Sequence, residues 1–150
     1  LDLDPVEQFF TYFTDIIKDQ SQMEKVLARG GFVIVDRYFA STVAFQTAQG
    51  FSYRQALAVL DLIKPLIPDI GFFIEVAPHT AMQRCQKRTP PDRHERDLAL
   101  LTAVAKQYWH LVYDGALAKR WLVLDGNKPL DVVKTKLSEF ITELIASWER

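Results

Sequence analysis

The sequence predicts an α/β fold in which a parallel sheet is flanked by helices. Three short apolar runs, at residues 32–35, 71–76 and 121–124, alternate with segments of helical periodicity. Apolar runs without alternation are typical of strands that are covered on both faces. Strands that alternate with helices favour a parallel sheet. The 150 residues contain no repeat and no linker, so we expect one domain over residues 1–150 with a substantial core.

The first helix has a well-defined predicted start. Asp4 can cap it, proline follows at the first helical position, and Glu7 completes a capping box. Apolar residues then recur at helical spacing as far as Leu27, and Gly30–Gly31 ends the helix. Three phenylalanines of this helix are expected in the core: Phe9, Phe10 and Phe13.

The remaining helices follow from the same periodicity and from the breaks between them. Prolines and an Asp-Gly-Asn sequence mark where helical or apolar segments end. The predicted helices cover residues 52–63, 78–87, 97–119 and 130–148.

Composition excludes several classes of function. A formal net charge of −1, from 18 Lys and Arg against 19 Asp and Glu, provides no global field for DNA or an acidic membrane. The single cysteine, Cys85, rules out an internal disulfide and fits a reducing compartment. No apolar run is long enough to cross a bilayer, and no signal peptide opens the chain. We therefore expect a cytoplasmic protein without nucleic acid or membrane as a partner.

A group of polar residues follows the apolar run at 32–35. Asp36 and Arg37 come first, and Ser41, Thr42 and Gln46 follow, with Phe45 as an apolar wall. Ligands of open α/β sheets bind beyond the carboxyl ends of the strands. Arginine binds phosphate in bidentate fashion, and an acid beside it can hold a Mg²⁺-bound water. Glu75 and Asp125 also follow predicted strands, but there we interpret the acids as the points where strands leave the core.

A second group of cations surrounds a Thr-Pro-Pro-Asp break. A cluster of this kind is either a solvated surface or a mobile lid whose arginines close over transferring phosphates. The cations are Arg84, Lys87, Arg88, Arg93 and Arg96.

These motifs resemble the thymidylate kinase family of P-loop nucleoside monophosphate kinases. The Asp-Arg-Tyr-x-x-Ser-x-x-Ala-aromatic pattern occurs at residues 36–45, directly after an apolar run. Pro68-Asp69 before the second apolar run, the Asp-Arg-His-Glu sequence at residues 92–95, and Tyr108 also resemble the family. The resemblance implies a three-layer P-loop kinase fold, with a lid around residues 84–97.

The resemblance also implies roles. ATP would donate its γ-phosphate to dTMP, giving dTDP for dTTP biosynthesis, by in-line transfer with Mg²⁺. Asp36 and Arg37, with Arg88 and Arg93 of the lid, would be catalytic, and Asp36 would reach the metal through water. Ser41, Thr42, Phe45 and Gln46, with Arg37, would bind dTMP, and Arg84, Arg88, Asn127 and Lys128 would bind ATP. A homodimer through the long helices is left open.

Two departures from the family pattern stand out. Counting back from Asp36, Asp15 lies where the family usually carries an arginine for the dTMP phosphate, and Thr11 where it carries a phenylalanine. In addition, no G-x-x-x-x-G-K-[ST] sequence occurs in the chain. Since the chain begins with Leu1, we expect that a preceding segment with the first strand and this loop is missing, and that the chain as written is inactive. Kinases of other (deoxy)nucleotides and a non-catalytic binding domain with the kinase fold are the alternatives.

Overall fold

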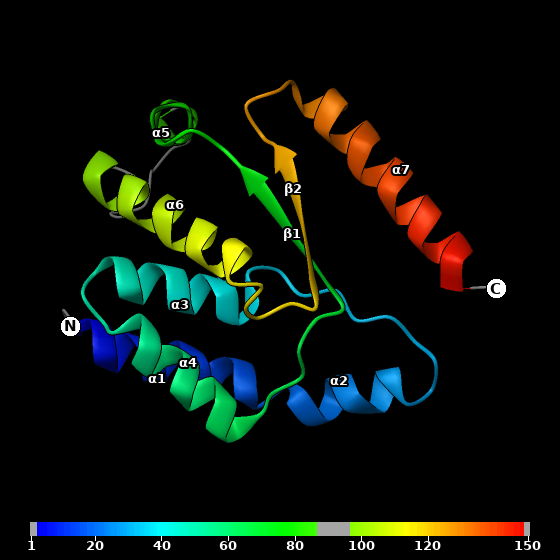
Figure 1. The fold of residues 1–150 in the computed structure, drawn as a ribbon, viewed down its shortest axis with the longest axis horizontal. Helices are drawn as coiled ribbons and strands as arrows, with labels where there is room; N and C mark the ends of the chain where they lie inside the picture. The colour runs from blue at the N-terminus through cyan, green and yellow to red at the C-terminus, as the bar shows by residue number, and fades with distance from the viewer. Residues whose placement is uncertain (1–2, 87–96, 149–150) are drawn as a thin grey trace.

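The computed structural model describes residues 3–86 and 97–148 of the chain. Figure 1 shows two strands side by side, with α6 on one side of them and α7 on the other. The helices are α1 (Pro5–Ile17), α2 (Gln20–Leu27), α3 (Tyr38–Ala48), α4 (Tyr53–Ile63), α5 (Pro78–Gln86), α6 (Leu98–Tyr113) and α7 (Leu130–Trp148), and the strands are β1 (Ile70–Glu75) and β2 (Arg120–Asp125).

The two strands pair in parallel, in a register that runs from Ile70 opposite Arg120 to Glu75 opposite Asp125. Both faces of this sheet are covered. The ring of Phe73 stacks on Tyr108 of α6, with centroids 5.4 Å apart. The ring of the preceding residue, Phe72, meets Phe140 of α7 edge-on at 6.2 Å. Successive strand residues point to opposite faces, so α6 and α7 form the outer layers of an α/β/α arrangement. The predicted α/β class with a helix-flanked parallel sheet is confirmed.

Residues 32–35, predicted as a strand, do not form one. A strand needs a neighbour for its backbone N–H and C=O groups, and in the described part of the chain the sheet consists of β1 and β2 alone. The side chain of Ile34 is 95% exposed, and Phe32 stacks on Trp148 near the end of α7. Asp36 therefore does not follow a paired strand.

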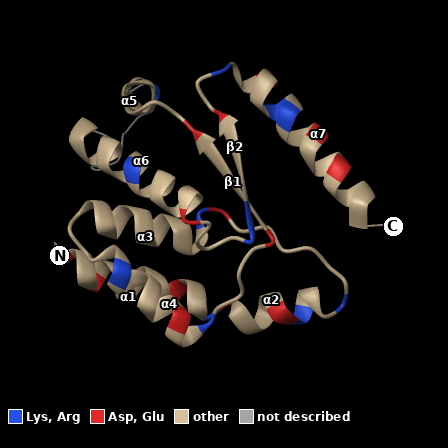
Figure 2. Ribbon diagram, viewed as in Figure 1, with Lys and Arg blue, Asp and Glu red and all other residues tan. Residues whose placement is uncertain are grey.

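The acids at the ends of the other two apolar runs lie as predicted. Glu75 and Asp125 are the last residues of β1 and β2 and face each other in the register. Figure 2 shows acidic residues at both arrowheads. Helix α5, after β1, carries Arg84, and the loop after β2 carries Asn127 and Lys128. These are residues that were predicted to bind ATP.

The main core lies among four helices rather than on the sheet. Helix α3 packs between α1 and α6, and Phe9, Val43 and Leu111 are fully buried where these helices meet. Burying a side chain of this size contributes about 1.5–3 kcal/mol. The other buried apolar residues of the cluster are Phe13, Phe39, Ala40, Ala44, Ala56, Leu60 and Val104.

The predicted first helix begins as expected but is interrupted. Both halves of the capping box between Asp4 and Glu7 are present. The chain then turns at Lys18–Asp19, and α2 buries none of its residues. After this turn, Gln20 Nε2 donates to the Tyr38 hydroxyl at 2.8 Å, and Gln20 Oε1 accepts from the Leu66 N–H at 2.9 Å. These bonds tie the start of α3 to the segment before β1.

Two smaller predictions about helices are also corrected. Phe10 is 45% exposed, because its neighbour Phe9 faces the core and adjacent helix residues point in different directions. The helix predicted to run to residue 119 ends at Tyr113, where Gly115 takes a φ of 62° that L-residues rarely adopt. Helix α7, in contrast, has the predicted bounds.

Candidate functional site

A cavity of about 970 Å³ opens between α1, α2, the segment before α3 and α3 itself, and we call it the α1–α3 pocket. Its walls contain polar groups from distant parts of the sequence. Six residues that the sequence analysis singled out line it together: Asp36, Arg37, Ser41, Thr42, Phe45 and Gln46.

The backbone at the mouth of this pocket is strained. The Tyr38 N–H donates to the Asp36 carbonyl at 2.9 Å, which closes a γ-turn around Arg37. Arg37 has φ 68° and ψ −55°, the rare form of this turn, and Tyr38 also has a positive φ of 50°. Strain of this kind costs about 1–3 kcal/mol per residue and is concentrated at functional sites. The Tyr38 hydroxyl, bonded to Gln20 and to the Leu66 carbonyl at 3.0 Å, anchors the turn.

The charged side chains of the turn are accessible. Both Asp36 and Arg37 are exposed. The structure gives the Arg37 guanidinium no hydrogen-bond or ion-pair partner among residues 3–86 and 97–148. A fork of donors that the described residues leave unpaired beside a cavity is suited to a phosphate or carboxylate of a ligand.

Tyr108 connects α6 to this turn. Its hydroxyl lies close enough to Ser41, Arg37 and Asp36 for all three side chains to influence its pKa. Burial raises the pKa of Tyr108, while the Ser41 hydroxyl and the Arg37 charge act in the opposite direction. The phenol therefore stays neutral near pH 7.

Two polar residues deeper in the pocket are almost fully buried. Thr42 is 6% exposed and Gln46 is 2% exposed. The Gln46 Nε2 donates to Gln8 Oε1 at 3.0 Å, but Gln46 Oε1 has no hydrogen-bond partner. A buried acceptor left unpaired costs about 1–3 kcal/mol, a penalty that a ligand with an N–H or O–H donor can remove. Sequence reasoning missed Gln8, since a glutamine on an amphipathic helix carries no distinguishing signal.

Helix α1 supplies the opposite wall. Asp15 lines the pocket and forms an exposed ion pair with Lys18. Tyr12 also lines it, whereas the hydroxyl of Thr11 is bonded to the Glu7 carbonyl at 2.8 Å. Tyr12 is thus the aromatic side chain that α1 brings to the pocket.

The charge balance of the lining is acidic. Among the residues that the structure describes, the lining holds three carboxylates, of Asp15, Asp19 and Asp36, against one guanidinium, of Arg37. An anionic ligand would therefore need its negative charge placed beside Arg37. It would also gain from any further cation that approaches the mouth.

The predicted nucleotide-side residues lie elsewhere, at the arrowhead end of the strands. We call Arg84, Asp125, Gly126 and Asn127 the strand-end clasp, because their polar groups bond to one another and to the backbone. Arg84 donates to the Gly126 carbonyl at 2.7 Å, which joins α5 to the loop after β2. Asn127 accepts from the Ala77 N–H at 2.9 Å and donates through Nδ2 to Asp125 at 2.9 Å.

Packing and charge reinforce this clasp. A Cβ on Gly126 would lie 2.7 Å from Ile74 Cγ2 and 2.8 Å from the Glu75 carbonyl oxygen, so the loop crosses the end of β1 too closely for a side chain. Hydrogen bonds from Asn127 lower the pKa of Asp125 below its ordinary value. Lys128 reaches the same carboxylate at 3.9 Å. None of the clasp residues is among those that line the α1–α3 pocket.

Some predicted residues fall outside the described part of the chain. Arg88 and Arg93, assigned to catalysis and to the lid, lie within residues 87–96, as do Lys87 and Arg96. Of the predicted lid at 84–97, the structure describes the two ends only.

The described residues do not form a ready-made metal centre. Within residues 3–86 and 97–148, no cluster of three or more His, Cys, Asp or Glu is arranged to hold a metal ion. Mg²⁺ keeps several waters and is commonly held by one or two carboxylates plus substrate phosphates. The exposed carboxylate of Asp36 beside Arg37 is compatible with that mode of binding. In addition, no described helix has the length and apolarity that a membrane crossing requires.

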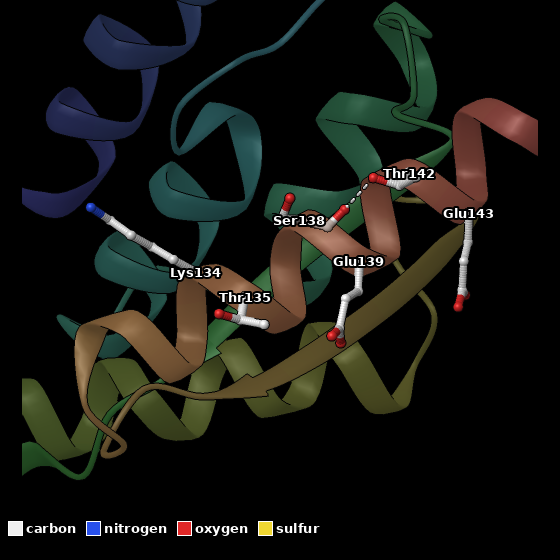
Figure 3. Close-up of a pocket in the computed structure, with 6 residues that line it drawn as sticks. All are labelled: Lys134, Thr135, Ser138, Glu139, Thr142 and Glu143. Carbon is white, nitrogen blue, oxygen red and sulfur yellow. Dashed lines mark hydrogen bonds between the residues drawn. The ribbon is translucent and has the colours of Figure 1, made fainter.

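A second hollow, of about 600 Å³, lies along α7 (Figure 3). All of its lining side chains come from this one helix and are exposed. Lys134 and Glu143 point away from each other, and the Thr142 hydroxyl bonds back to the Ser138 carbonyl at 2.9 Å. This surface presents no converging polar groups.

Comparison with known proteins identifies the family. The model of the family described as thymidylate kinase matches residues 3–137. The chain is 28% identical to a thymidylate kinase of Chromohalobacter salexigens, over 85% of the chain and 61% of that protein. It is 30% identical to the thymidylate kinase of Methylococcus capsulatus, over 83% and 60%. It is 28% identical to a probable thymidylate kinase of Archaeoglobus fulgidus, over 95% and 70%.

The chain thus spans about three fifths of the length of the first two relatives. The matched region includes the α1–α3 pocket and the strand-end clasp, since both lie within residues 3–137. The resemblance first indicated by the Asp-Arg-Tyr pattern is therefore confirmed: the chain belongs to the thymidylate kinase family.

Proposed function

We propose that the protein is a nucleoside monophosphate kinase that transfers the γ-phosphate of ATP to dTMP, giving dTDP. The observation that carries the proposal is the α1–α3 pocket, whose lining includes Arg37, just before α3, and Gln46, on α3. The Arg37 guanidinium has no partner among the described residues, and Gln46 Oε1 is a buried acceptor without a partner. A nucleoside monophosphate has the matching groups, a phosphate at one end and a base with N–H donors at the other.

In this proposal Arg37 binds the dTMP phosphate through its guanidinium fork. Phe45 and Tyr12 form apolar walls beside the sugar and base, and Thr42 and Gln46 bond to the edge of the base. The γ-turn fixes Arg37 before the substrate arrives, so less conformational entropy is lost on binding. Phosphoryl transfer depends mainly on this kind of positioning and on charge neutralisation.

ATP and Mg²⁺ belong to the same proposal. Mg²⁺ supplies neutralisation of phosphate charge, and Asp36 would hold it through a water. Arg88 and Arg93, which lie outside the described residues, would contribute positive charge to the phosphates. Arg84, Asn127 and Lys128 would border the adenine. Because Arg84 and Asn127 are already bonded within the clasp, their part would be to hold the loop in place.

The test is isothermal titration of the chain with dTMP and, separately, with thymidine. The proposal expects saturable binding of dTMP at one site and at least about tenfold weaker binding of thymidine, since the phosphate–arginine pair is lost. Competition by dCMP, dGMP and dAMP then ranks the bases. Equal affinities for dTMP and thymidine, or preference for a purine nucleotide, would contradict it. Conversion of dTMP to dTDP by the full protein with ATP and Mg²⁺ completes the test.

A further inference from the structure

We propose that Gln8 is a positioning residue that decides which face of the Gln46 amide meets the ligand. By holding the Gln46 NH₂ group, it leaves the carbonyl oxygen of Gln46, a residue that lines the α1–α3 pocket, as the atom still able to accept from a ligand. The pocket then selects a base that carries a ring N–H at that edge. This inference rests on the proposed function, because it assumes that a nucleobase reaches Gln46.

The direction of the hydrogen bonds between Leu3, Gln8 and Gln46 is fixed by a backbone carbonyl. The Leu3 backbone carbonyl can only accept, and Gln8 Nε2 lies 2.8 Å from it. Gln8 must therefore turn its NH₂ group toward Leu3 and its Oε1 toward α3. Gln46 Nε2 lies 3.0 Å from that Oε1 and donates to it. Gln46 Oε1 is what remains, buried and unpaired.

The positions of both partners are fixed by the fold. The capping box between Asp4 and Glu7 holds the chain at the start of α1, and the Gln8 N–H donates to the Asp4 carbonyl at 2.9 Å. Gln46 lies on α3, whose neighbouring residues Val43 and Ala44 are fully buried. If the Gln46 amide turned over, two carbonyl oxygens would face each other and the bond to Gln8 would be lost. The fold therefore favours one orientation.

An acceptor in this position distinguishes pyrimidines by their chemistry. Thymine and uracil have a donor N–H at ring position 3, which satisfies Gln46 Oε1. Cytosine has an unprotonated acceptor nitrogen there, so two acceptors would meet without a proton between them. A buried polar group left unpaired by the wrong substrate is a strong source of discrimination. We expect dTMP and dUMP to bind about 10- to 100-fold more tightly than dCMP.

The test uses three substitutions at Gln8, with calorimetric titration of the chain by dTMP and dCMP. Gln8→Leu removes the acceptor, and the dCMP-to-dTMP ratio of Kd should fall to within about threefold of unity. Gln8→Glu keeps an acceptor for Gln46 and should preserve the ratio. Gln8→Lys offers only donors, so it should turn the Gln46 amide over and shift preference toward dCMP. Gln55→Leu, the same chemical change at an exposed position of α4, is the control and should leave the ratio unchanged.

The dCMP-to-dTMP ratio of Kd shows whether Gln8 positions Gln46 or only stabilises the fold. Equal weakening of dTMP and dCMP by Gln8→Leu, or an unchanged ratio, overturns the inference while leaving the proposed function intact. Loss of dTMP binding in the unmodified chain overturns both. If circular dichroism shows that Gln8→Leu does not fold, the contrast between Gln8→Glu and Gln8→Lys decides: equal ratios in these two variants contradict the inference, and opposite shifts support it.

Discussion

The α1–α3 pocket and the strand-end clasp both gather polar side chains, but they leave them in opposite states. In the clasp, Arg84 and Asn127 are bonded to backbone groups and to Asp125. In the pocket, Gln46 keeps a buried acceptor without a partner, and Arg37, on a strained turn, has no hydrogen-bond or ion-pair partner among the described residues. Satisfied polar groups stabilise a fold, whereas unpaired ones reduce stability unless a ligand completes them. The difference teaches that residue type alone does not tell a binding site from a structural bond.

The largest expected effect is loss of ligand affinity at Arg37. Arg37→Ala removes a charge-assisted, bidentate contact to phosphate, which is worth about 1.5–3 kcal/mol, or roughly a 10- to 150-fold weaker Kd for dTMP. Because the guanidinium has no described protein partner, urea unfolding should show no loss of stability. Arg54→Ala, an exposed arginine of α4, is the matched control. A stability loss without an affinity change would place Arg37 with the clasp residues instead.

A substitution in the strand-end clasp should reduce stability and leave the affinity for dTMP unchanged. Asn127→Ala removes the bonds to the Ala77 N–H and from Nδ2 to Asp125, and the free energy of unfolding should fall by about 1–2 kcal/mol. The affinity for dTMP should not change, because Asn127 does not line the pocket. Denaturant unfolding and dTMP titration of one preparation measure both quantities. If dTMP affinity falls together with stability, the two regions are coupled and the comparison fails.

A smaller effect is expected from the acid on α1. Asp15 carries a negative charge in the pocket lining, where the family usually has an arginine. Asp15→Asn should strengthen dTMP binding by roughly two- to tenfold, since like charges near a protein surface repel by about 1 kcal/mol or somewhat more. The gain should shrink at high salt. Asp61→Asn, on the exposed face of α4, should have no such effect, and weaker dTMP binding by Asp15→Asn would show that Asp15 helps to hold the ligand.

The smallest expected effect is a change in the pKa of Asp125. Hydrogen bonds from Asn127 hold the pKa of Asp125 below its ordinary value of 3.8. Because this pKa is depressed by folding, it contributes stability above pH 3.8 that is lost as the pH falls through the folded-state value. Asn127→Ala should move the pKa of Asp125 up toward 3.8, which carboxyl carbon NMR measures directly. An unchanged pKa would mean that Lys128 or Lys136 is its main cause.

Local signals predicted much of the fold. The capping box at Asp4 and Glu7, the apolar run that became β1 and the periodicity of α7 depend on neighbouring residues, so they can be read from the sequence. The run at 32–35 has the same local signal as β1, but whether it forms a strand depends on a neighbouring strand. The break between α1 and α2 depends on the contacts of Gln20 with distant residues.

Several residues of the α1–α3 pocket were singled out from the sequence, but its geometry was not predicted. The Asp-Arg-Tyr pattern indicated the residues around Asp36 and Arg37 because they are contiguous along one turn and helix. The positive φ of Arg37 could not be predicted, because nothing in the sequence distinguishes this arginine from one with an ordinary backbone conformation. Gln8 was missed because its importance depends on the bond that it makes to Gln46, 38 residues away. Asn127 and Arg84 were assigned to ATP binding because the family resemblance implies it, and that role stays a prediction. The structure adds the hydrogen bonds that hold both residues in the clasp, which the sequence did not indicate.

The most direct test of the α1–α3 pocket as the substrate site is a crystal structure of the chain, from crystals grown with dTMP. We predict density for the nucleotide in the α1–α3 pocket, with its phosphate on the Arg37 guanidinium and its ring N–H within hydrogen-bond distance of Gln46 Oε1. Gln46 Nε2 should remain bonded to Gln8. A nucleotide bound at the strand-end clasp, or a pocket that stays empty at saturating dTMP with Gln46 Oε1 still unpaired, would contradict the assignment of this pocket as the substrate site.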